Sequence, residues 1–62
     1  PLKFYINFGD LRFETGSKET ALYWFPNEEE IEYHKEHSLA DSVAYTQIDG
    51  NWYIVEELFH WW

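Results

Sequence analysis

The chain has 62 residues, of which twelve are Asp or Glu and four are Lys or Arg, so its formal net charge is −8. This charge argues against direct binding to nucleic acids or anionic membranes, because both rely on clustered Lys and Arg. The absence of cysteine excludes disulfides and thiolate metal sites. The longest apolar run, residues 21–25, is far shorter than the ~20 residues of a membrane span. We therefore expect one soluble, cytoplasmic domain over residues 1–62.

Aromatic side chains are unusually frequent, at 23% of all residues. A domain of this size buries only about 60% of its unfolded surface, so it cannot enclose every ring. Exposed aromatic clusters are typical of interaction sites. We therefore expect a homodimer, a partner-binding patch, or both.

The N-terminal third predicts short strands. Residues 2–8 alternate between apolar and polar side chains, which is typical of a half-buried strand. Gly9-Asp10 predicts a two-residue turn into a second strand over residues 11–14. Residues 15–17 break the pattern.

The segment over residues 20–25 allows two interpretations. Ser17 could cap a short helix there, whereas an aromatic run followed at once by proline favours a strand. We favour the strand, with a turn at residues 26–28.

Residues 30–37 separate cleanly into two sets at a period of two, so that the even-numbered side chains would share one face of a strand. A helix capped by Asn27, with Glu30 at its third position, is the competing prediction. We favour the strand because the alternation runs through the whole segment.

The C-terminal part contains the predicted helix. Residues 38–41 have the spacing of a capping box, with Asp in place of the usual Glu or Gln, and predict a short helix over about 38–46. Residues 49–51 predict a turn and residues 52–56 the last strand. Residues 58–62 are too apolar for a free tail and should pack against the domain. The expected fold is α+β, a small antiparallel sheet with one short helix, and the sheet could continue across a homodimer.

Neither metal binding nor catalysis is expected. His34 and His37 would point to opposite faces of a strand, so they and His60 predict no metal site. The chain has no nucleophile motif, phosphate loop or dinucleotide fingerprint, and it is too short to form a closed cleft easily. We predict a non-enzymatic protein without cofactors.

The acidic residues of segment 28–36 are the most informative feature. On a strand they would form a row at intervals of ~6.6–6.8 Å, interrupted only by His34. Regular negative charge beside aromatic rings resembles a DNA backbone with its bases, and it would attract the Lys and Arg of a DNA-binding groove. Two other interpretations are an edge strand protected by charge against aggregation and acidity that only keeps the chain soluble.

Residues 32–35, Glu-Tyr-His-Lys, followed by Ser-Leu at 38–39 and by Asp41, resemble a stretch of the small phage-encoded uracil-DNA glycosylase inhibitors. In that family the stretch joins a strand to a helix. The match covers seven positions. A fainter likeness links residues 19–30 to the acidic edge strand of a larger phage inhibitor of the same enzyme.

The resemblance implies an acidic DNA mimic that sits in the DNA groove of the glycosylase. There, an apolar pocket takes up the side chain that the enzyme normally inserts into the duplex. Glu32 falls on the family's functional strand glutamate, and Tyr33 and Asp41 are shared neighbours. After Asp41 the pattern departs, because Ser42-Val43 replaces the family's Phe-Glu pair, so the family's helix contacts are not carried over.

We therefore expect an inhibitor whose partner is a protein with a basic DNA-binding groove, acting in the host cytoplasm if the chain is phage-encoded. The expected acidic edge consists of Glu28, Glu30, Glu32, Glu36 and Asp41. The expected apolar pocket comes from Tyr23, Phe25, Ile31, Tyr33, Val43 and Trp52. One alternative is an acidic inhibitor of another nucleic-acid-binding or defence protein, such as a nuclease, CRISPR effector or RNA polymerase. The other is a non-catalytic assembly module with an aromatic binding face.

Overall fold

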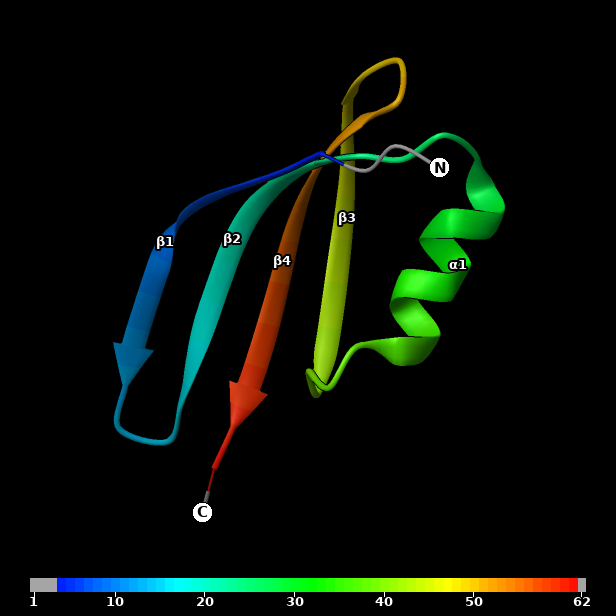
Figure 1. Cartoon of the computed structure of the whole chain (residues 1–62). Coiled ribbons are helices and arrows are strands. Elements are labelled where there is room, and N and C mark those ends of the chain that lie inside the picture. Colours follow the sequence, from blue (N-terminus) through cyan, green and yellow to red (C-terminus); the bar gives the residue numbers. More distant parts are fainter. Residues whose placement is uncertain (1–3, 62) are drawn as a thin grey trace.

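Two β-hairpins joined by a helix make up the part of the chain that the computed structural model describes, residues 4–61, with side chains from Ile6 onward. The elements are β1 (Phe4–Phe13), β2 (Gly16–Trp24), α1 (Glu28–His37), β3 (Ser42–Asp49) and β4 (Trp52–His60) (Figure 1). All neighbouring strands are antiparallel, in the order β1-β2-β4-β3. The predicted α+β class, an antiparallel sheet with one short helix, is confirmed.

The first hairpin corrects the predicted turn at Gly9-Asp10. β1 runs straight through these residues, and the register with β2 shifts by one residue between Asn7 and Gly9. The predicted turn is therefore a β-bulge, and Gly9 suits it because its φ of 135° favours glycine. The chain reverses after Phe13, and Gly16 begins β2, which confirms the strand predicted at 20–25 as far as Trp24. Leu2 and Lys3 of the first predicted strand lie outside the described residues.

The strand predicted over residues 30–37 is wrong, because this segment forms α1. The Asn27 side-chain oxygen accepts a hydrogen bond from the Glu30 backbone N–H at 3.0 Å, as in the competing helix prediction. Three glutamates lie in the first turn, and His34, Lys35 and His37 lie in the last, so both ends complement the helix dipole. Alternation was misleading here because nearly all of these side chains are polar, so it carried no information about burial.

The helix predicted over about 38–46 is also wrong. Residues 38–41 form a loop, and β3 begins at Ser42. The capping-box residues bind β4 instead. The Ser38 hydroxyl donates to the Glu57 carboxylate at 2.7 Å, and the Asp41 carboxylate accepts from the His60 backbone N–H at 2.6 Å. Side chains that could cap a helix therefore fasten a loop to the sheet.

The second hairpin follows the prediction more closely. Gly50, with a φ of 53°, and Asn51 form the turn between β3 and β4. β4 extends past the predicted end to His60, and the Trp61 backbone N–H donates to the Thr15 carbonyl at 2.9 Å. The C-terminal segment is not a free tail as far as His60, which ends β4, but the Trp61 side chain is 44% exposed, and Trp62 lies outside the described residues.

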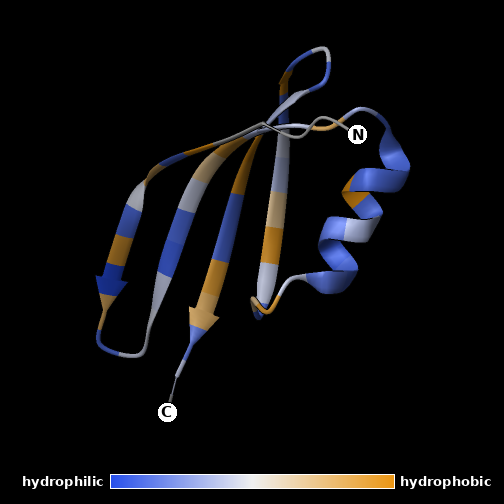
Figure 2. Cartoon of the chain, viewed as in Figure 1, coloured by the Kyte–Doolittle hydropathy of each residue, from blue (hydrophilic) through white to orange (hydrophobic). Residues whose placement is uncertain are grey.

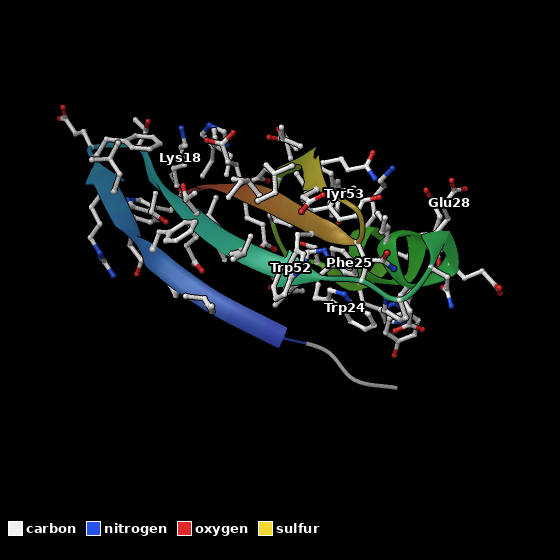
Figure 3. All side chains as sticks on the ribbon, turned by 90° about the horizontal axis from the view of Figure 1, so that it is seen from above. Lys18, Trp24, Phe25, Glu28, Trp52 and Tyr53 are labelled. Carbon is white, nitrogen blue, oxygen red and sulfur yellow. The ribbon has the colours of Figure 1, made fainter. Side chains whose placement is uncertain are left out.

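The core lies between α1 and one face of the sheet. Its buried side chains are Ala21, Tyr23, Phe25 and Val55, with Ile31, Val43, Tyr45 and Tyr53 packed against them. His34 of α1 contacts the rings of Tyr23, Phe25 and Tyr45 edge to face. Phe25 lies between the sheet and the helix (Figure 3), and α1 is hydrophilic apart from a narrow apolar band (Figure 2). Among the described residues, no helix or strand covers the other face of the sheet. The one helix of this part of the chain, α1, is too short and too polar to cross a membrane.

Candidate functional site

The outward side of α1 carries a dense set of carboxylates, which we call the acidic stripe. It consists of the exposed side chains of Glu28, Glu29, Glu32 and Glu36. Residues three and four apart lie on the same face of a helix, and four residues correspond to a rise of about 6 Å. The row of charge expected on a strand edge is thus present on a helix instead. Figure 3 shows Glu28 projecting away from the body of the molecule.

The acidic stripe has little internal compensation. The Lys35 ammonium lies 3.5 Å from the Glu32 carboxylate, and both side chains are largely exposed. Such a pair contributes little, typically below about 1 kcal/mol. Within the described residues, Glu28, Glu29 and Glu36 have no cation at ion-pair distance. Like charges four residues apart destabilise a helix by about 0.2–0.5 kcal/mol per pair, so the stripe costs α1 some stability.

A hydrophobic hollow of about 360 Å³ lies beside the acidic stripe, where the end of α1 meets the following loop and β4. Its lining residues are Tyr33, His34, His37, Ser38, Leu39, Glu57 and Phe59. Tyr33 borders both the hollow and the acidic stripe. Leu39 is 93% exposed, which is unusual for a leucine in a folded domain. The site therefore combines a charged helix face with an adjoining apolar contact surface.

Two of the five acids predicted for the edge lie elsewhere. Glu30 is half-buried at the helix N-terminus, where its backbone binds Asn27, and it does not share the face of Glu28 and Glu32. Asp41 is in the loop after α1, with its carboxylate 3.4 Å from the His60 ring nitrogen. Glu29 was not among the predicted acids, and it joins the stripe because helical spacing replaces the alternation of a strand.

The six residues predicted for an apolar pocket do not form one. Tyr23 and Phe25 are enclosed in the core, and Ile31 and Val43 pack against it. Trp52 pairs with Trp24, one residue out of phase with Tyr23, and therefore lies on the opposite face of the sheet. Only Tyr33 contributes to the hydrophobic hollow. Leu39 and Phe59 line the hollow but were not predicted, because they come together only when the loop after α1 lies beside β4.

A second acidic group crosses the sheet on the same side as α1. Asp10, Glu19 and Glu57 occupy neighbouring register positions on β1, β2 and β4. Desolvation, followed by the charges of Asp10 and Glu57, raises the pKa of Glu19. These residues are far apart in sequence, so only the strand register brings them together.

His34 and His37 make structural contacts with tyrosine side chains. The His34 Nδ1 atom lies 2.5 Å from the Tyr45 hydroxyl, and the His37 ring stacks on Tyr33 with 4.0 Å between centroids. Burial, with the charges of Glu57 and Glu32, raises the pKa of Tyr45 to about 12. No group of three or more His, Cys, Asp or Glu that could hold a metal ion occurs in residues 4–61.

The resemblance to the glycosylase inhibitors does not extend to secondary structure. Residues 32–35 lie within α1, and residues 38–41 form a loop, whereas in that family the stretch joins a strand to a helix. No protein-family model matches the chain, and comparison with curated proteins and with solved structures gave no significant match.

Proposed function

We propose that this protein is a non-catalytic inhibitor that mimics DNA and occupies the DNA-binding groove of a nucleic-acid enzyme, with uracil-DNA glycosylase as the first target. The acidic stripe carries the proposal, because its carboxylates share one exposed helix face without a matching set of cations. Charge repeated at about 6 Å intervals attracts the Lys and Arg residues that line a DNA groove.

The hydrophobic hollow supports a specific complex over a purely electrostatic one. It adjoins the stripe at Tyr33, and the exposed Leu39 at its rim offers apolar surface that a partner can bury. Charges on the stripe would accelerate association, whereas apolar burial at the hollow would slow dissociation. A groove that accepts both features must combine basic side chains with an apolar projection.

Uracil-DNA glycosylase is the first target because of the residue resemblance at 32–35, 38–39 and Asp41. The test measures uracil excision from an oligonucleotide by a bacterial enzyme with increasing amounts of this protein. We expect inhibition that is competitive with DNA and complete near stoichiometric amounts. Without inhibition at large excess, the glycosylase is not the target. The broader proposal of a DNA mimic fails if the protein also shows no binding that DNA displaces to a nuclease, a CRISPR effector or RNA polymerase.

The location of the charge is tested by comparing two lysine variants. Glu32→Lys places the charge change in the middle of the acidic stripe, and Glu14→Lys makes the same change in the exposed β1–β2 turn, away from α1 (Figure 1). We expect Glu32→Lys to weaken binding at least roughly tenfold and Glu14→Lys to have a much smaller effect. Equal losses would mean that only the net charge matters, and the stripe would then not be the binding surface.

A further inference from the structure

The face of the sheet opposite α1 is apolar, and we call it the open face. Residues opposite each other in neighbouring strands point to the same side of a sheet. Ala21, Val55 and Tyr45 are opposite one another and belong to the core side, so the residues out of phase with them lie on the other side. The apolar members of the open face are Ile6, Leu11, Phe13, Leu22, Trp24, Trp52, Ile54 and Leu58.

The composition of the open face is that of a covered surface. An antiparallel sheet with one solvated face alternates apolar and polar residues along each strand. β4 departs from this rule, because Trp52, Ile54 and Leu58 face away from the core while Val55 faces into it. Ile6 and Leu11 on β1 are 51% and 63% exposed in the single chain. The β-bulge at Gly9 keeps these two on the same face, because it shifts the alternation of β1 by one residue.

The paired strand positions of this face carry Lys18 and two acidic residues, Glu56 and Asp49, so its charge is close to balanced, unlike that of the α1 side. On the two central strands its Lys and acidic residues are Lys18 and Glu56, which form an ion pair at 2.9 Å. The acidic stripe and the row of Asp10, Glu19 and Glu57 lie on the α1 side. Two copies can therefore approach through their open faces without bringing their acidic surfaces together. The Lys18–Glu56 pair carries both signs, so it can also pair with the same residues of a second copy across a two-fold axis.

The area of the open face is sufficient for a dimer. The strands contain eight to ten residues each, so four strands make a face of roughly 30 by 19 Å, or about 600 Å² before the relief of the side chains is added. The described part of the chain is a slab with extents of 35 × 22 × 16 Å. Specific interfaces bury about 800 Å² per partner, and weak ones somewhat less. A second open face thus supplies the area of an interface at the small end of this range.

We propose that the protein is a homodimer in which the open faces of two copies pack against each other, sheet on sheet, with both α1 helices outside. This arrangement covers the apolar residues of β1, β2 and β4 and leaves the two acidic stripes accessible. It also stabilises a domain that is small and has no disulfide, for which a single core rarely supplies more than about 3–5 kcal/mol. The proposal does not depend on the proposed function, since it involves the other side of the molecule.

Sedimentation equilibrium of the purified full chain tests the dimer. We expect twice the chain mass of 7.6 kDa, with dissociation on dilution. Leu11→Lys places a charge in the interface twice per dimer and should weaken association roughly 100-fold. Leu39→Lys makes the same change at an exposed leucine on the α1 side and should leave association unchanged. A chain that is monomeric at every concentration, or equal effects of the two variants, would overturn the proposal.

A second measurement uses the unmodified protein, so it does not depend on how a variant folds. Trp24 and Trp52 lie opposite each other on the open face, at the end of the strands far from Lys18 (Figure 3). On dilution their fluorescence emission should shift to longer wavelength, with the same midpoint as dissociation, because water reaches the indole rings. Emission that stays constant while the dimer dissociates would place the interface elsewhere and refute the open-face arrangement.

Discussion

The contact between His34 and Tyr45 links α1 to β3 through polar atoms inside an otherwise apolar core. The imidazole ring packs against Tyr23, Phe25 and Tyr45, so it contributes apolar area as well as a hydrogen bond. Partial burial of the Tyr45 hydroxyl disfavours its ionised form, and the carboxylates of Glu57 and Glu32 add to that effect. The phenol of a single residue thus makes helix docking sensitive to high pH.

This contact predicts how stability changes at alkaline pH. The pKa of Tyr45 is raised in the folded state from 10.0 to about 12, so the folded protein keeps this proton when the unfolded chain has lost it. The stabilising contribution is complete below about pH 10 and is lost as the pH rises towards 12. Tyr45→Phe cannot ionise and should show a smaller decline over this window. Urea unfolding of both proteins across the window measures the difference, and parallel curves would contradict the prediction.

At the scale of elements, α1 combines favourable ends with limited packing against the sheet. None of its side chains is fully buried, and Ile31 and His34 provide its main contacts with the sheet. Its favourable terms are the Asn27 cap and charges at both termini that complement the dipole. The acidic stripe opposes them through repulsion between like charges. A helix balanced in this way is sensitive to the loss of a single capping bond.

Asn27→Ala should therefore destabilise the protein by about 1 kcal/mol, because the Glu30 N–H loses its acceptor. In a domain of this size, that loss lowers the melting temperature by roughly 4–8 °C. Asn27→Asp keeps an oxygen acceptor at the same position and should change the melting temperature little. Thermal unfolding at one fixed protein concentration measures both variants. If Asn27→Ala melts with the parent, the cap is not important for α1.

For the whole molecule, the arrangement of charge separates two surfaces with different expected partners. The acidic stripe and the hydrophobic hollow lie on the α1 side, and the open face lies on the other. A complex guided by net negative charge loses long-range attraction as salt screens it, whereas apolar sheet packing does not. The two surfaces should therefore respond differently to ionic strength.

This difference gives a test with two readouts on one sample. Raising sodium chloride should lower the association rate with a basic partner, while the dissociation constant of the homodimer stays constant or falls because self-repulsion is screened. Stopped-flow association and sedimentation equilibrium measure the two quantities. Self-association that weakens with salt would mean that ion pairs, and not apolar packing, hold the copies together.

Local patterns in the sequence sufficed for several features. The β-strand at 20–25 and the turn at Gly50-Asn51 follow from β-propensity and turn residues. The α+β class was also predicted correctly, although its helix was assigned to the wrong segment. Composition likewise indicated exposed aromatic side chains and an acidic surface. These features depend on neighbours in sequence, which the chain displays directly.

The tertiary structure decided the remainder. Residues 30–37 satisfy both a strand period and a helix capped by Asn27, and the docking of Ile31 and His34 on the core favours the helix. Ser38 and Asp41 have the spacing of a capping box, yet their partners are Glu57 and His60, about twenty positions further along the chain. Contacts at such separations arise only from the strand order and register. For the same reason the acidic stripe was recognised as charge but assigned the wrong geometry, and the open face emerged only once β4 was placed beside β2.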